Sequence, residues 1–289
     1  MCGIFFLKSK VMALTHKSGW NGIINAIELL KTRGPDRTEI RIFESEVLGF
    51  CRLAINSISK IGDQPFCMVV DLDRRISLIM NGEIYNHKKI QKKYKFPNTT
   101  GSDCEVMIHL YLKFGITSII DQLDGVFAFT LVDRDNVYFG RDAIGVRPLY
   151  FRQKDKDIVI ASTPLSLEGF SYFGKTQQVP PGSYYHFYDN RLDLVKWYQI
   201  PRVNLNTDYN WQTNIRKVLI AATRKRLLSD RPIGCLLSGG LDSSLIASIL
   251  SRLMAPRKLQ TFSIGFNENA TDILAARKVA NFLQTDHHE

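Results

Sequence analysis

The sequence contains no apolar run near the roughly 18–20 residues that a membrane-spanning helix needs. Its opening, MCGIFFLKSK, has its charges after a short apolar stretch, the reverse of the order in a secretory signal. These absences predict a cytoplasmic protein without a membrane partner. The 289 residues are 45% hydrophobic and 23% charged, which is typical of globular chains with one large or two smaller domains.

Cysteine is scarce, and its spacing argues against structural crosslinks. The five cysteines are odd in number and contain no CxxC pair, so neither a disulfide framework nor a zinc site is expected. Most of them should be small buried apolar residues. Cys2 differs because it stands beside the first residue.

The chain is basic, with a formal charge of +10 and a pI near 9.4. Such a balance can indicate nucleic-acid binding. The densest basic run, residues 87–95, has its apolar members at helical spacing, which favours the solvated face of a surface helix. A nucleic-acid partner is therefore not predicted.

The first two thirds of the chain has a β-rich pattern. A strand is expected at 2–7, a helix at 21–31 capped by Asn21, a turn at Asn81-Gly82 and a helix at 103–114 opened by Asp103. Further strands are expected at 47–51, 68–72, 76–80, 126–132, 136–140, 157–162 and 183–189.

The pattern changes near residue 205. Helices at 210–228, 242–253 and 272–283 alternate with strands at 233–237 and 259–266, which predicts a parallel sheet. We place the boundary between 200 and 210, giving domains 2–205 and 210–289.

Cys2 is a candidate nucleophile. Removal of Met1 would give Cys2 a free α-amino group, whose reference pKa near 8 allows it to act as the base for its own thiol. Cys2-Gly3-Ile4 alone is a weak signal. The motifs that follow in order strengthen it: Arg33-Gly34-Pro35-Asp36, Arg52-Leu53-Ala54-Ile55, Asn81-Gly82-Glu83-Ile84-Tyr85-Asn86, Gly101-Ser102-Asp103-Cys104-Glu105, Asp124-Gly125-Val126-Phe127-Ala128-Phe129 and Gly140-Arg141-Asp142.

With these motifs, the first 200 or so residues resemble the glutaminase domain of class II glutamine amidotransferases. The resemblance implies an α+β fold, the four-layer αββα sandwich of N-terminal-nucleophile hydrolases. It implies that Cys2 attacks the glutamine amide while Asn81 and the Gly82 N–H hold the oxyanion. It also implies a glutamine-binding set of Arg52, Leu53, Ala54, Ile55, Asn81, Gly82, Glu83 and Asp103.

Within that set, Arg52 matches the α-carboxylate of glutamine, and Asp103 with Glu83 matches its α-ammonium. Residues 33–36 are expected to support the pocket loop. Thr32 stands where the family commonly has His, and Cys51 stands where it often has His or Glu. Neither position is catalytic in the resemblance.

A second chemical signal lies at Leu236–Ser244, LLSGGLDSS, between a predicted strand and helix. Two glycines and a helix N-terminus direct N–H groups toward an anion. The string resembles the loop of ATP-pyrophosphatases, which implies ATP and Mg²⁺ as cofactors. The implied ATP-binding residues are Leu236, Ser238, Gly239, Gly240, Asp242, Ser243, Ser244 and Ile264.

Together the two parts resemble asparagine synthetases over essentially the whole chain. That family adenylates aspartate with ATP and displaces AMP with ammonia from glutamine. The later Ser-Gly-rich acidic loop of that family is not found here, so we expect a partial α/β ATP-pyrophosphatase domain and no asparagine from this chain alone. The alternatives are a stand-alone glutaminase, an ammonia donor to a partner synthetase chain, and a non-catalytic regulatory fragment. Homo-oligomers are also compatible with the sequence.

Overall fold

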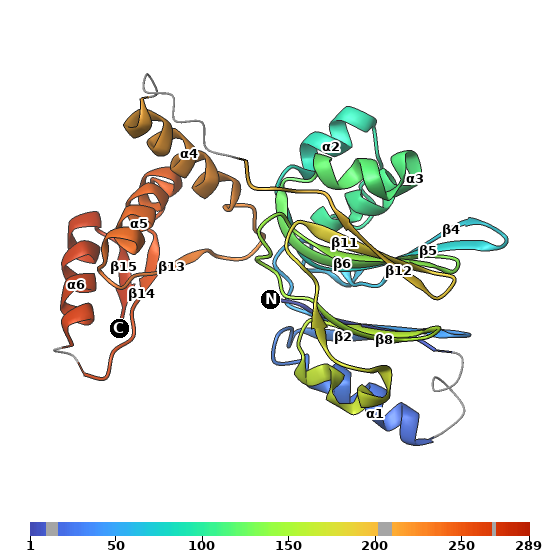
Figure 1. Ribbon diagram of the computed structural model, residues 1–289. Coiled ribbons are helices and arrows are strands. Elements are labelled where there is room, and N and C mark those ends of the chain that lie inside the picture. The colour runs from blue at the N-terminus through green and yellow to red at the C-terminus, as the bar shows by residue number, and fades with distance from the viewer. Residues whose placement is uncertain (10–16, 202–209, 268–269) are drawn as a thin grey trace. The chain divides into compact units, whose positions relative to one another are not determined.

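The computed structural model describes residues 1–9, 17–201, 210–267 and 270–289. The chain divides into two compact units, Met1–Arg202 and Val203–Glu289, shown with their elements in Figure 1. The predicted boundary at 200–210 falls mostly on residues 202–209, which lie outside the described residues.

The first unit is built on two antiparallel six-stranded sheets, with strand orders β10-β8-β9-β1-β3-β2 and β12-β11-β7-β6-β5-β4. Its elements are β1 (Gly3–Lys8), α1 (Lys17–Glu28), β2 (Arg37–Phe43), β3 (Glu46–Arg52), η1 (Lys60–Gly62), β4 (Phe66–Asp71), β5 (Arg74–Ile84), α2 (His87–Tyr94), η2 (Asp103–Glu105), α3 (Val106–Ile119), η3 (Ile120–Gln122), β6 (Gly125–Asp133), β7 (Asn136–Arg141), β8 (Tyr150–Lys154), β9 (Asp157–Ala161), η4 (Leu165–Phe173), β10 (Gln177–Gln178), β11 (Ser183–Tyr188) and β12 (Arg191–Lys196).

The predicted αββα sandwich is confirmed by three layers of buried side chains. Ile4 and Phe6 of β1 join a cluster between the two sheets, while Phe5 and Leu7 join a second cluster under α1 and η4. Side chains alternate across a strand, so a strand buried on both faces reads as a continuous apolar run. This explains why GIFFL has no polar alternation.

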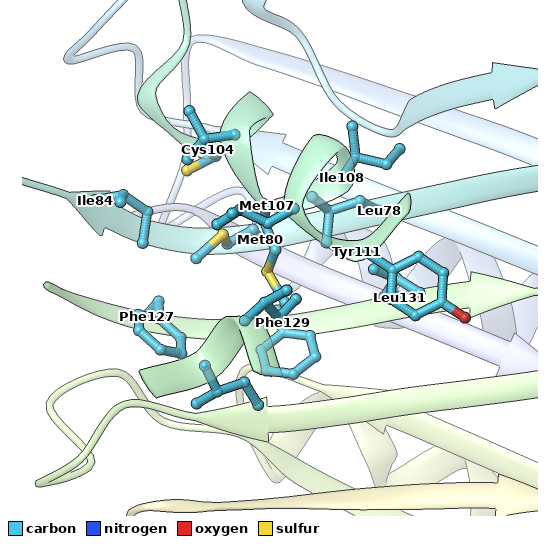
Figure 2. Packing of buried hydrophobic residues seen from close by; sticks show 14 of the residues in the cluster. Leu78, Met80, Ile84, Cys104, Met107, Ile108, Tyr111, Phe127, Phe129 and Leu131 are labelled. Atoms are coloured by element: carbon cyan, nitrogen blue, oxygen red, sulfur yellow. The ribbon is translucent and has the colours of Figure 1, made fainter. Parts of the chain in front are cut away.

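The third layer lies between the second sheet and helices α2 and α3 (Figures 1 and 2). Figure 2 shows side chains of β5, β6 and α3 meeting there, among them Met80, Phe129 and Met107. The lysine-rich stretch forms α2 as predicted, with His87 and Ile90 buried and its lysines facing outward. These layers fix β5, which carries much of the candidate site.

Two local expectations were wrong. Asn21 lies inside α1, which begins at Lys17, and so it does not cap the helix. Asn81-Gly82 forms no turn, because β5 continues through both residues and pairs them with Ala128 and Phe127 of β6. A Cβ on Gly82 would lie 2.3 Å from the Val126 carbonyl oxygen. Glycine is therefore needed for the close approach of β6.

The second unit has a parallel sheet of order β13-β14-β15, which confirms the predicted parallel pairing. A small cluster of buried side chains, including Leu237, Ala247 and Ala276, lies between this sheet and its helices. Its elements are α4 (Trp211–Lys225), β13 (Gly234–Leu236), α5 (Leu241–Met254), β14 (Gln260–Phe262), α6 (Thr271–Leu283) and β15 (Asp286–His288).

Among the described residues, no helix combines the length and the apolar character needed to cross a bilayer.

Candidate active site and candidate nucleotide loop

Cys2 lies immediately before β1, the strand buried at the centre of its sheet. Its Sγ accepts a hydrogen bond from the Leu53 N–H at 3.4 Å and lies 3.6 Å from the Leu53 carbonyl oxygen. The Cys2 carbonyl oxygen in turn accepts from Arg33 Nε at 3.1 Å. The thiol is therefore held against the segment that follows β3.

Most of the predicted glutamine-site residues line one pocket with Cys2. Those brought together are Cys2, Arg52, Leu53, Ile55, Asn81, Gly82, Glu83 and Asp103. Ala54 does not line this pocket, and its N–H donates to Asp36 Oδ2 at 2.8 Å. This contact and the Arg33 contact agree with the predicted supporting role of residues 33–36.

The edge of β5 supplies hydrogen-bond donors to the pocket. Pairing with β4 ends at Leu78, so the later residues of β5 have an open edge on that side. Alternate N–H groups of a strand point to the same edge. The Met80 N–H donates to Gln64 Oε1 at 2.6 Å, and the Ile84 N–H donates to Asp103 Oδ2 at 2.6 Å. The Gly82 N–H lies between them and points to the same edge.

Asn81 presents a second donor at this place. Its side chain is 1% exposed, and among the described residues Nδ2 has no hydrogen-bond partner. A buried amide without an acceptor is costly unless a ligand supplies one. An Asn amide beside a strand N–H has the donor chemistry of an oxyanion hole.

Asp103 is a buried carboxyl group at the pocket wall. Ser102, whose Oγ accepts from the Cys104 N–H, caps the short helix that Asp103 begins, so the capping role expected of Asp103 was wrong. Burial raises the pKa of Asp103 to about 6, and the Ile84 N–H partly opposes that rise. A cation placed against this group would favour its ionised form.

Arg52 is already engaged. Its guanidinium forms an ion pair with Asp63 and donates to the carbonyl oxygens of Ser59, Asn56 and Ser57. Both terminal nitrogens therefore carry contacts. For Arg52 to bind the α-carboxylate of glutamine through two N–H groups, some of these contacts must be exchanged for contacts to the ligand.

The charges around Cys2 oppose the effect of its burial. Burial raises the pKa of the Cys2 thiol, while the Leu53 N–H, the amino group of Met1, Arg52 and Arg147 act to lower it. A thiolate is the nucleophilic form of cysteine. The arrangement surrounds a shielded thiol with groups that stabilise its anion.

Several pocket residues were not singled out from the sequence. Gln64, Asn56 and Arg147 line the pocket with Cys2. Asn56 Nδ2 donates to Asp103 Oδ1 at 3.4 Å, and Arg147 donates to Glu83 Oε1 at 3.3 Å. None of the three stands in a pattern that reveals such a contact, because each comes from a loop whose path the tertiary fold determines.

The predicted phosphate loop joins β13 to α5 in the second unit. Gly239 has φ +77°, and a Cβ there would lie 2.5 Å from Ala275, so this bend needs glycine. Ser238 and Ser243 lie with their hydroxyl oxygens 3.0 Å apart, and Ser243 Oγ also donates to the Gly240 carbonyl oxygen. The buried Ser244 hydroxyl has no partner among the described residues.

This loop has the features of an anion cradle. It turns at two glycines into the N-terminus of a fourteen-residue helix, and it carries a hydroxyl that no group in the described part of the chain satisfies. Leu236 and Ile264 are 81% and 94% exposed. No group of three or more metal-ligating side chains occurs within the described ranges.

The two antiparallel sheets, the half-buried Cys2 and the donors on β5 define the glutamine amidotransferase class of N-terminal-nucleophile folds. Residues 1–179 match the model of the glutamine amidotransferase domain family, and the chain belongs to that family. Residues 214–289 match the asparagine synthase family model.

The chain is also similar to curated proteins named asparagine synthetase [glutamine-hydrolyzing]. It is 36% identical to the one from Cricetulus griseus over 323 aligned residues, which cover 100% of this chain and 56% of that protein. It is 39% identical to the one from Zea mays over 310 residues, covering 100% of this chain and 50% of that protein. The chain thus spans about half the length of these relatives.

Among solved structures, the glutamine phosphoribosylpyrophosphate amidotransferase from B. subtilis shares this fold. Its TM-score is 0.56 at 17% identity, with 99% of this chain and 65% of that chain covered. The allosteric regulatory enzyme of purine biosynthesis gives the same TM-score and identity, with 64% of that chain covered.

Proposed function

We propose that the first unit is a glutaminase in which Cys2 attacks the side-chain amide of glutamine and releases ammonia. The observation that carries this proposal is the single pocket in which Cys2 meets Asn81, Gly82 and Asp103. Loss of Met1 frees the α-amino group of Cys2. That group accepts the thiol proton. The thiolate sulfur then forms a bond to the amide carbon of glutamine, and the amide carbonyl oxygen becomes an oxyanion.

The β5 edge supports the next step. Asn81 Nδ2, which has no partner within the described part of the chain, and the Gly82 N–H would hold the oxyanion. The ammonium of glutamine would lie against Asp103 and Glu83, and its carboxylate against Arg52. The amide nitrogen leaves with a proton as ammonia, and water then cleaves the thioester to glutamate.

We further propose that this ammonia serves the amidation of aspartate to asparagine, as the names of the relatives indicate. In this proposal the glutaminase domain covers 2–205 and the asparagine synthase portion 210–289. The loop from Ser238 to Ser244 would hold the phosphates of ATP, with Asp242 facing the Mg²⁺ that accompanies them. ATP supplies the activation that an unreactive carboxylate needs before ammonia can replace its oxygen.

The adenine would lie near Leu236 and Ile264, whose exposed side chains leave room for a base. The test of this second proposal is the yield of asparagine from glutamine, aspartate and ATP.

The test is release of ammonia and glutamate from glutamine by the purified chain, beside the Cys2→Ala variant. We expect measurable release that falls at least about a thousandfold in the variant, because loss of the nucleophile removes the covalent path. The intact mass should show that Met1 is absent. Equal release by both proteins, or no release after confirmed loss of Met1, would overturn the proposal in favour of a non-catalytic role.

A further inference from the structure

The loop between β7 and β8 is held rigidly beside the Cys2 pocket. Asp142, which is 1% exposed, accepts the N–H groups of Ile144 and Val146 at 3.2 and 3.0 Å. Its other oxygen accepts the Arg147 N–H at 3.1 Å. The Arg147 carbonyl oxygen accepts from Arg141 Nε at 2.6 Å. The backbone of Arg147 is therefore fixed on both sides.

The Arg147 side chain faces the same pocket as Cys2. One terminal nitrogen lies 3.3 Å from Glu83 Oε1, with the two side chains 14% and 17% exposed. Its Nε is buried and has no partner within the described ranges. A guanidinium that keeps an unused donor in a buried site is placed for an acceptor that the pocket receives.

The charges that face Cys2 and the amino group of Met1 come from several elements. They are Arg33, Arg52, Glu83, Asp103 and Arg147, together with the Cys104 thiol. Arg52 pairs with Asp63, and Arg33 donates to the Cys2 carbonyl oxygen. Arg147 pairs with Glu83, which lines the pocket with Cys2.

The charge of Arg147 acts on the Cys2 thiol. Burial raises the pKa of this thiol, and Arg147 acts to lower it. A lower thiol pKa favours the thiolate, which is the nucleophilic form of cysteine.

We propose that Arg147 is a further positioning residue of the Cys2 site, which pairs with Glu83 and stabilises the thiolate form of Cys2. Its part in catalysis rests on the proposed glutaminase function, whereas its effect on the thiolate does not. The proton leaves Sγ for the α-amino nitrogen, and Arg147 takes no part in bond formation. A ligand that brings an anion or an amide oxygen to Nε would complete its hydrogen bonds.

The experiment measures alkylation of the purified chain by iodoacetamide between pH 5.5 and 9, with each cysteine followed separately by mass spectrometry. The thiolate attacks the reagent carbon and iodide leaves, so the rate reports the thiolate fraction. Cys67 is exposed and serves as the internal reference. The variants are Arg147→Gln and Arg147→Lys. Arg41→Gln, at an exposed position on β2, is the matched loss of one charge.

We expect Arg147→Gln to move the Cys2 profile to higher pH by about half a unit or more, which is roughly a threefold slower rate below the midpoint. Arg147→Lys keeps the charge and should recover most of the rate. Arg41→Gln and the Cys67 profile should stay unchanged. An unchanged Cys2 profile in Arg147→Gln would refute the proposal.

Glu83→Gln gives a second test that does not depend on the folding of the first variant. It removes the carboxylate that offsets Arg147, so the Cys2 profile should move to lower pH, and a move to higher pH would contradict the proposal. Alkylation needs no glutamine. Failure of ammonia release therefore counts against the proposed function alone, and an unshifted alkylation profile counts against the role of Arg147 alone.

Discussion

The two candidate sites of this chain are built in different ways. In the first unit, Asn81, Asp103 and Arg52 are 1%, 3% and 4% exposed, and other protein groups hold the side chains of Asp103 and Arg52. In the second unit, the phosphate loop has the backbone shape of an anion site, yet Leu236 and Ile264 beside it are 81% and 94% exposed. The geometry of a site and its shielding from water are thus separate properties. Substitutions in the first site should therefore reduce activity and stability more than substitutions in the second.

The largest expected difference concerns the oxyanion donor. Asn81→Ala should lower kcat for glutamine hydrolysis by about 100- to 1,000-fold with little change in KM, because a preorganised donor acts mainly in the transition state. Steady-state ammonia release measures it. Ser244→Ala, in the loop of the second unit, is the matched control and should leave glutamine hydrolysis unchanged. A fall in kcat of less than tenfold for Asn81→Ala would contradict the assignment of Asn81 as an oxyanion donor at the edge of β5.

Stability should follow the same division. Leu131 is 0% exposed in the layer shown in Figure 2, so Leu131→Ala should lower the free energy of unfolding by about 3 kcal/mol. Leu236→Ala should change it by less than about 0.5 kcal/mol because the side chain is already exposed. Urea unfolding followed by circular dichroism checks both. A comparable loss in the two variants would show that Leu236 is covered in solution.

Asp63 tests how the pocket holds its arginine. Asp63→Asn should raise KM for glutamine by about tenfold with kcat nearly unchanged, because Arg52 loses the charge that orients it, as expected for a lost buried ion-pair partner. Asp189→Asn, at an exposed position, should leave both constants as they are. A fall in kcat at constant KM would instead assign Asp63 to the chemical step.

The smallest expected effect is the pH dependence set by Asp103. Its pKa of about 6 in the folded chain lies above its ordinary value of 3.8. The ammonium of glutamine favours the carboxylate, so binding to the Cys2→Ala variant should tighten several-fold as pH rises through 6. Calorimetry from pH 5 to 7 measures this. Asp103→Asn should bind more weakly with a flat profile, and a profile that stays sloped in Asp103→Asn would assign the titration elsewhere.

The same shift gives Asp103 a defined effect on folding. Below pH 4 the group is protonated in both states and contributes nothing. Between pH 4 and 6 the unfolded chain releases the proton first, so the free energy of unfolding falls as pH rises and then levels off. Comparing the native chain with Asp103→Asn over this range isolates that contribution.

Much of the fold could be predicted from apolar patterns, because β1 and β6 are buried on both faces and α5 is amphipathic. The turn expected at Asn81-Gly82 shows where local rules fail. Asn-Gly usually forms a turn, but here it continues a strand because β6 needs the space that a side chain on Gly82 would fill.

The candidate site was predictable where its residues stand in motifs, as Asn81 and Asp103 do. Arg147 was not, because its place depends on the loop that Asp142 holds and on contact with Glu83, sixty-four residues earlier in the chain. Arg52 was found, but its engagement by Asp63 appears only in three dimensions.

The open edge of β5 has one more consequence. An unpaired strand edge is normally a hazard, since its free N–H and carbonyl groups invite another chain to pair. Here the backbone groups of Met80, the first residue with a free edge, are bound by the carboxamide of Gln64. This group accepts from the Met80 N–H at 2.6 Å and donates to the Met80 carbonyl oxygen at 3.1 Å. The chain already docks one of its own glutamine side chains on this edge. The substrate proposed to bind at the next inward-facing N–H group of this edge, that of Gly82, carries the same carboxamide group. The edge of β5 would therefore bind the substrate amide beside a glutamine side chain of the chain itself.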